Sequence, residues 1–157
     1  MEKYQGLVDL ILTTEDVVKL GDEIDILLKG LYHVESGEFE QKLREEVRLR
    51  VAGEIRRLLG GSAAQSKEEI NAVLSSAYRT VCALPMLKLI LAFEPSEVVI
   101  NDISHWARVN LEKGIIIDLS LDRNILGGAV IIYRGKFYDF SIRKKLHEIF
   151  VLGIFTL

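Results

Sequence analysis

Apolar and polar residues alternate with two different periods, and the change of period divides the chain near residue 84. Before that point, apolar residues recur at steps of three and four, which is the spacing of a helix with one buried face. They form three stripes, at residues 17–31, 39–58 and 70–84. The sequence therefore predicts about three helices in this region, with a further short helix in the first twelve residues.

The polar residues between these stripes indicate where the helices begin and end. Ser66 and Glu69 have the spacing of a capping box, and Pro85 ends the third stripe. A short break at 33–37 separates the first two stripes and favours an antiparallel helix pair, and a Gly/Ser-rich joint at 60–66 precedes the third.

After residue 85 the pattern becomes that of a sheet with helices. Residues 86–93 form an apolar run of strand length, and strict alternation over 115–121 indicates a strand with one solvated face. The helix between them is expected to bury Val99, Ile103, Trp106 and Ala107. Strand, helix and strand in this order imply a right-handed parallel crossover.

A hairpin over 129–140, turned by Arg134-Gly135, should extend the sheet, and Ser141 should cap a last helix. That helix is expected to pack Ile142, Leu146, Ile149 and Phe150 against the sheet. The predicted fold class is α+β: a helical region at 1–84 and a small β-α-β-β-α domain at 85–157 with a mixed four-stranded sheet.

Composition and charge narrow the functional classes. With 157 residues, 49% hydrophobic and 27% charged, the chain has the makeup of one globular domain or two small ones. The formal net charge of −3 argues mildly against general nucleic-acid binding. The single Cys82 cannot form an internal disulfide, which favours an intracellular protein. No apolar run reaches the roughly 18 residues of a spanning helix, so we expect any membrane association to depend on partners.

Two groups of residues are candidates for sites of chemistry. Gly127-Gly128 lacks the spacing of a phosphate-binding loop and leads into a strand, so a structural turn or bulge is favoured over nucleotide binding. Asp118, Asp122 and Asp139 have no histidine partner at a catalytic or metal-binding spacing, which favours solvated strand faces and turns. We expect no catalytic residue, no metal and no cofactor.

The end of the chain carries the candidate interface. Arg143, Lys144 and Lys145 occupy the first turn of the last helix, where the helix dipole disfavours cations by about 0.3–1 kcal/mol each. Either they meet an acidic partner, or they form a solvated edge or pair internally with Asp139 or Glu148. The apolar tail at 151–157 either packs on its own sheet or docks on a partner. The predicted interface residues are Arg143, Lys144, Lys145, Phe150, Ile154 and Phe155.

Two motifs in this region resemble a known family. Asp122-Arg-Asn-Ile-Leu-Gly-Gly128 precedes the hairpin, and Asp139-Phe-Ser-Ile-Arg143 follows it. Together with the segment Leu89–Ser96, they resemble the C-terminal part of the delta subunit of F-type ATP synthases, the family that includes the oligomycin-sensitivity-conferring protein. The resemblance covers roughly residues 84–150. The family's early Tyr-Ala-x-Ala-Leu pattern is absent, and about three helices stand in place of its six-helix bundle.

The resemblance implies a noncatalytic peripheral-stalk subunit of a proton- or sodium-translocating ATP synthase. Such a subunit joins the alpha/beta head to the C-terminal helices of the b subunits, and lies at the cytoplasmic face of the cell membrane through the complex. Nucleic acid is not an expected partner. Two alternatives stay open: a free-standing interaction or regulatory module that reuses the fold, and a small enzyme or nucleotide binder using Gly127-Gly128.

Overall fold

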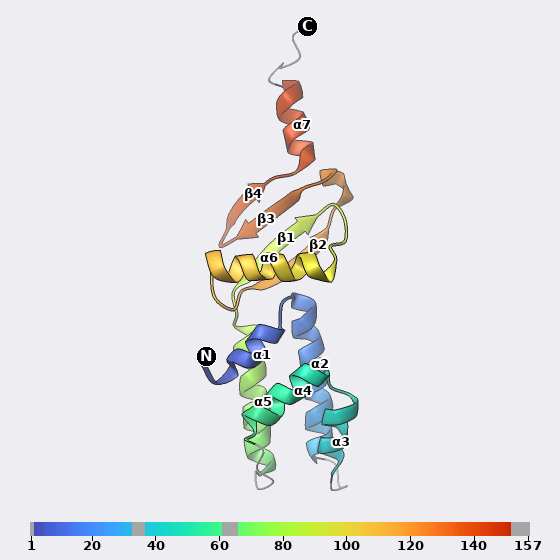
Figure 1. Cartoon of the computed structure of the whole chain (residues 1–157), viewed down its shortest axis with the longest axis vertical. Helices are drawn as coiled ribbons and strands as arrows, with labels where there is room; N and C mark the ends of the chain where they lie inside the picture. Colours follow the sequence, from blue (N-terminus) through green and yellow to red (C-terminus); the bar gives the residue numbers. More distant parts are fainter. Residues whose placement is uncertain (1, 33–36, 61–65, 152–157) are drawn as a thin grey trace. The chain divides into compact units, whose positions relative to one another are not determined.

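The computed structural model describes residues 2–32, 37–60 and 66–151, and it divides into two compact units (Figure 1). The first unit comprises residues 1–11 and 15–84, and the second comprises 12–14 and 85–157. Helices dominate the first unit, and a four-stranded mixed sheet lies in the second. The α+β fold class predicted from the sequence is confirmed.

The first unit is built on two long helices. They contact one another at Gly21 and Tyr78, and the Tyr32 hydroxyl accepts a hydrogen bond of 2.9 Å from the Asn71 amide. Its elements are a 3-10 turn η1 (Glu2–Tyr4), α1 (Gln5–Leu10), α2 (Thr14–Tyr32), α3 (Glu38–Glu45), α4 (Leu49–Leu58) and α5 (Lys67–Cys82). The apolar stripes meet in its interior, where the fully buried side chains include Leu7, Leu20, Leu27, Leu43, Ile55 and Leu74.

The helix predicted over 39–58 is wrong in one respect, because it is broken into α3 and α4. At the break, Arg48 is extended, with φ −52° and ψ 132°, and its backbone N–H donates to Glu23 Oε1 at 2.9 Å. A carboxylate from α2 thus takes a donor that a continuous helix would have used internally. By contrast, the capping box of Ser66 and Glu69 at the start of α5 is confirmed. The predicted break at 33–37 and joint at 60–66 fall largely outside the described residues.

The second unit has the predicted β-α-β-β-α order. Its sheet has the strand order β2-β1-β3-β4, with β1 parallel to β2 and antiparallel to β3. Helix α6 packs on one face, against a core that includes Leu87, Leu89 and Ile117. The elements are β1 (Met86–Leu91), α6 (Glu97–Asn110), β2 (Ile116–Leu121), a 3-10 turn η2 (Arg123–Ile125), β3 (Ala129–Tyr133), β4 (Lys136–Asp139) and α7 (Ile142–Val151).

A short segment from the beginning of the chain joins this sheet. Thr13 forms a parallel bridge with Ile117, and the Ile117 N–H donates to the Leu12 carbonyl at 2.9 Å. Residues 12–14 therefore cover part of the β2 edge, an arrangement that the apolar pattern of the first twelve residues did not predict. Strand β4 forms the other edge of the sheet.

Two predictions about buried faces are wrong. Trp106 and Val99 are 50% and 40% exposed, whereas the predicted burial of Ala107 is confirmed and Ser104 lies beside it in the interior. The last helix does not bury its apolar residues on the sheet, and no residue of α7 is buried. Helix α7 contacts η2, and at its start the Ile142 N–H donates to the Gly127 carbonyl.

Candidate partner-binding surface

The two glycines before β3 form a tight junction with the chain that leaves β4. Gly127 and Gly128 have φ values of +154° and +75°, which favour glycine. The Ile142 N–H donates to the Gly127 carbonyl at 2.9 Å, and the Phe140 N–H donates to the Ala129 carbonyl at 2.9 Å. A Cβ atom on Gly128 would collide with the Phe140 carbonyl oxygen. The glycines thus let the start of β3 lie directly against the start of α7.

The hairpin that leads to this junction is fixed at its turn. Arg134 and Gly135 have φ values of +49° and +74°, as a two-residue type I′ turn requires. The Tyr133 hydroxyl donates to Glu112 Oε2 at 2.8 Å, and Arg134 Nη2 donates to the same oxygen at 2.6 Å. These hydrogen bonds, from Tyr133 and then Arg134, lower the pKa of Glu112. The turn is thereby tied to the segment that follows α6.

The aspartates considered as a cluster serve separate structural roles. Asp122 Oδ1 accepts the Asn124 N–H at 2.9 Å and caps η2. Asp139 Oδ1 accepts the Ser141 N–H at 2.8 Å, and hydrogen bonding from Ser141 lowers the pKa of Asp139. Asp118 accepts a weak hydrogen bond of 3.5 Å from the Thr14 hydroxyl.

Helix α7 begins at a well-defined cap. Ser141 is fully buried, and its hydroxyl accepts the Lys144 N–H at 3.1 Å. The predicted capping role of Ser141 is confirmed. Together, Asp139 and Ser141 fix where the helix starts relative to the sheet, so the side chains of its first turn have defined positions.

The three basic residues of this first turn are exposed, and they differ in their surroundings. Lys144 Nζ lies 3.8 Å from Glu148 Oε1, an i,i+4 pair along the helix. At about 100° per residue, Arg143 and Lys145 project on either side of the apolar stripe of α7, whereas Lys144 lies on the opposite face. Within the described part of the chain, neither Arg143 nor Lys145 forms an ion pair.

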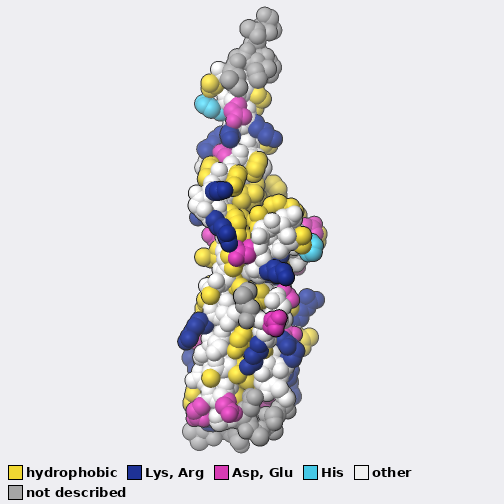
Figure 2. All heavy atoms as spheres, turned by 90° about the vertical axis from the view of Figure 1, so that its left-hand side faces the viewer, with side chains coloured by type: hydrophobic (Ala, Val, Ile, Leu, Met, Phe, Trp, Pro, Cys, Tyr) yellow, Lys and Arg dark blue, Asp and Glu magenta, His cyan; other side chains and the backbone are white. Residues whose placement is uncertain are grey.

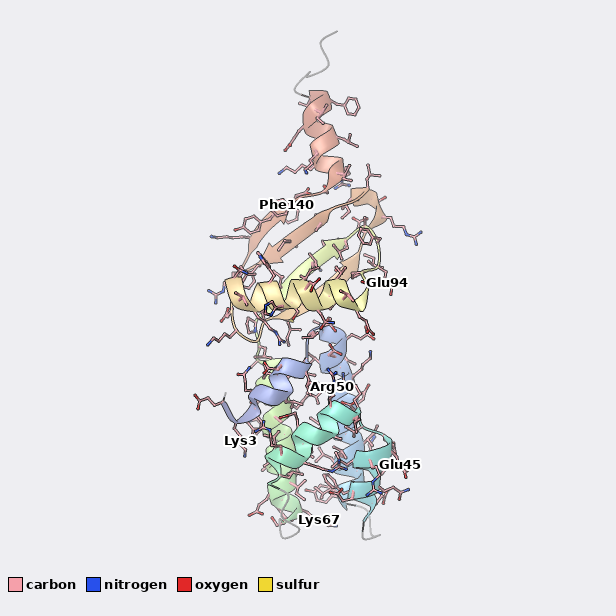
Figure 3. The ribbon with its side chains drawn as sticks, in the orientation of Figure 1. Lys3, Glu45, Arg50, Lys67, Glu94 and Phe140 are labelled. Atoms are coloured by element: carbon pink, nitrogen blue, oxygen red, sulfur yellow. The ribbon has the colours of Figure 1, made fainter. Side chains whose placement is uncertain are left out.

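An apolar surface is exposed between these two cations. Ile142 is 46% exposed, Leu146 39% and Phe150 73%, while Ile149 is half-buried. In the chain, the stripe follows the aromatic residues at the end of the hairpin, where the rings of Tyr138 and Phe140 stack with centroids 6.5 Å apart. Figure 2 shows apolar side chains gathered on the visible face of the second unit below α7, and Figure 3 places Phe140 where β4 leads into α7.

The structure brings together three of the six residues predicted for an interface. Arg143, Lys145 and Phe150 border or belong to one surface, from which Lys144 points away. Ile154 and Phe155 lie outside the described residues. Tyr138 and Phe140 were missed, although the density of aromatic residues in Phe137-Tyr138-Asp139-Phe140 was a signal in the sequence.

Membrane-spanning helices, metal sites and similarity to known proteins are the remaining features that bear on function. Among the residues that the structure describes, no helix is both long and apolar enough to cross a membrane. Within the same residues, no group of three or more His, Cys, Asp or Glu side chains has an arrangement that suits a metal ion. No protein family model matches the chain, and a comparison with curated proteins finds no match. What the fold and surface define is an α+β protein whose second unit presents an amphipathic helix.

Proposed function

We propose that this protein is a noncatalytic delta-type subunit in the peripheral stalk of an F-type ATP synthase. In this role it links the catalytic alpha/beta head to the b-subunit stalk and resists the torque of the rotor. Its work is mechanical and requires no cofactor. The synthase in question translocates protons or sodium ions. The subunit would lie at the cytoplasmic face of the cell membrane, held there by its partners.

The observation that carries the proposal is the junction between the two motifs on which the resemblance rests. Asp122–Gly128 and Asp139–Arg143 are separated by the hairpin, yet they meet through the hydrogen bond from Ile142 to Gly127 and the close approach of Gly128 to Phe140. Motifs that build one structural feature are more informative than two unrelated matches. Their geometry explains why both glycines and the Asp-x-Ser step are needed in this order.

The exposed face of α7 also supports a role in assembly. A helix whose apolar stripe has no cover within its own described unit is typical of a protein that functions in contact with another. A stalk subunit must hold two partners under load, and a rigid sheet with a projecting amphipathic helix suits one of these contacts. In this proposal, the helices of the first unit make the contact with the other partner.

A free-standing interaction module is the second candidate. It is favoured by the small size of the first unit, in which α1, α3 and α4 each have ten residues or fewer. Such a unit differs from the six-helix bundle that the resemblance implies for binding the alpha subunit. A monodisperse protein with no affinity for synthase subunits would support this candidate.

Affinity purification of the tagged chain from its native membranes in mild detergent, with mass spectrometry of the recovered subunits, tests the proposal. Recovery of alpha, beta and b subunits at near-equal stoichiometry with the tagged chain is the expected result. A Gly128→Val variant provides a matched control, because it disrupts the junction without altering the charge of the surface. Recovery of the chain without synthase subunits, while the synthase carries another delta subunit, would overturn the proposal.

A further inference from the structure

We infer that α7 and the stacked aromatic pair of Tyr138 and Phe140, at the end of β4, form a docking surface for an amphipathic helix whose apolar stripe is bordered by acidic residues. This inference deepens the proposed function, on which it rests for the identity of the partner. The surface consists of Tyr138, Phe140, Ile142, Leu146, Ile149 and Phe150, with Arg143 and Lys145 at its borders.

The exposed apolar residues follow one another along the chain from the sheet to the helix. The rings of Tyr138 and Phe140 are nearly parallel, at 4°, and they are 45% and 57% exposed. Ser141 follows at once and starts α7, so the stacked pair leads directly to Ile142. Apolar residues then recur at three- and four-residue steps to Phe150, a spacing that packs against the ridges of another helix.

The charges around this stripe indicate the chemistry of the partner. Arg143 and Lys145 lie near the positive end of the α7 dipole, and among the described residues neither forms an ion pair. The carboxylate nearest in effect to Arg143 is Asp139, which already accepts hydrogen bonds from Ser141. Lys144, on the other side of the helix, pairs with Glu148. Acidic side chains on a docked helix would compensate the two bordering cations, because opposite charges are brought together as the apolar stripes pack.

Two other occupants fit these charges less well. A second copy of the chain would bring the same basic residues to the contact, and the one acidic residue of α7, Glu148, already pairs with Lys144. An anionic membrane surface would suit a basic amphipathic helix. However, the net charge of the whole chain is −3, which disfavours a general attraction to an anionic surface.

Binding of two synthetic fluorescent peptides to the full chain tests the inference. Each peptide has about 20 residues, long enough to form a helix, with a leucine stripe at three- and four-residue steps. One peptide carries glutamate on both borders of the stripe, and the other carries lysine there. Fluorescence anisotropy should show binding of the glutamate peptide and at least about tenfold weaker binding of the lysine peptide.

Matched variants separate this surface from the rest of the molecule. Arg143→Glu and Lys145→Glu should each weaken binding of the glutamate peptide about tenfold, whereas Lys144→Glu, the same charge change on the opposite face, should alter it by less than about threefold. Leu146→Ser should abolish binding, and Val109→Ser, at the 70% exposed Val109 of α6, should not. All five positions are exposed, so circular dichroism should show a retained fold.

Several results would overturn the inference. They are equal binding of both peptides, no binding of the glutamate peptide, and a loss with Lys144→Glu as large as that with Arg143→Glu. Dimers in sedimentation equilibrium that dissociate on Leu146→Ser would assign the surface to a second copy. Binding to phosphatidylglycerol vesicles that Leu146→Ser removes would assign it to a membrane.

The peptide experiment and the affinity purification can fail independently. If the glutamate peptide binds as expected while no synthase subunit is recovered from membranes, the docking surface stands and the stalk assignment falls. If synthase subunits are recovered and Leu146→Ser does not change their recovery, the stalk assignment stands and the complex uses another surface.

Discussion

Gly128 lies so close to Phe140 that a Cβ atom at residue 128 would collide with the Phe140 carbonyl oxygen. The contact joins the start of β3 to the last residue before the cap of α7, and Gly128 has a φ of +75°. Two constraints therefore act on the same residue, one from its own backbone conformation and one from the neighbouring chain. The position and direction of α7 depend on both.

A Gly128→Ala substitution should lower the free energy of unfolding by roughly 2–4 kcal/mol, because a strained φ and a backbone collision add together. Gly135→Ala is the matched control. Gly135 has nearly the same φ, +74°, and nothing lies within 4 Å of the position its Cβ would take. That variant should lose only about 1 kcal/mol. Urea unfolding followed by circular dichroism measures both, and equal losses would show that the Phe140 contact contributes nothing.

In the first unit, the ion pair of Arg48 and Glu23 joins the residue before α4 to α2. Arg48 donates to Glu23 from Nε at 2.8 Å and from Nη2 at 3.1 Å, and the Glu23 side chain is 8% exposed. Arg48→Met should lower the free energy of unfolding by about 1–3 kcal/mol, because it leaves a buried carboxylate without its cation. The loss should fall short of that for a fully buried pair, since the Arg48 side chain is 35% exposed.

Arg56→Met is the control for this prediction. Arg56 and Glu40 lie 3.7 Å apart with side chains 43% and 60% exposed, and such a pair contributes less than about 1 kcal/mol. Thermal unfolding of the two variants distinguishes them. If Arg48→Met and Arg56→Met shift the midpoint equally, then the Glu23 contact is no stronger than a surface pair.

Features determined by local sequence were predictable. The capping box of Ser66 and Glu69 formed as expected, as did the Arg134-Gly135 turn and the cap at Ser141. Each depends on residues within a few positions of one another, so spacing along the chain is enough to identify it. The mixed four-stranded sheet followed from the strand, helix, strand order and the hairpin.

Features determined by distant contacts were not predictable. The break before α4 depends on Glu23, which is 25 residues away from Arg48, and no glycine or proline marks it in the sequence. Likewise, the period of α7 correctly indicated an amphipathic helix but not what covers its apolar side. A helix that packs on its own sheet and a helix that packs on a partner have the same pattern. Of the candidate surface, the sequence therefore predicted Arg143, Lys145 and Phe150, but not the aromatic pair of Tyr138 and Phe140 or the exposure of the apolar stripe.

The decrease in the free energy of unfolding at acid pH should depend on Glu112. Its pKa is lowered from the ordinary value of 4.5 by the hydrogen bonds from Tyr133 and Arg134. A depressed pKa in the folded state means that the carboxylate stabilises the fold above pH 4.5 and that this contribution is lost as the pH falls through the lower, folded-state pKa. Glu112→Gln should therefore reduce the fall in stability below about pH 4.5.

Urea unfolding measured between neutral and acid pH checks this expectation. Glu94→Gln, at an exposed position before α6, serves as the control and should leave the acid slope unchanged. If Glu112→Gln lowers stability by the same amount at every pH, the hydrogen bonds to Tyr133 and Arg134 do not depend on the charge of the carboxylate.

The exposure of Trp106 leads to the last prediction. Trp106 is the single tryptophan of the chain and is 50% exposed, although its position in the apolar pattern favoured burial. Replacing a buried aromatic by alanine costs about 3–5 kcal/mol, so Trp106→Ala should cost clearly less, about 1 kcal/mol. Ile117→Ala, at a fully buried residue of β2, should cost about 2–5 kcal/mol. In the folded wild-type protein, acrylamide should quench the tryptophan fluorescence readily. A larger loss for Trp106→Ala than for Ile117→Ala, together with weak quenching, would mean that Trp106 is covered in solution, and its exposed face would then mark a second contact surface on α6.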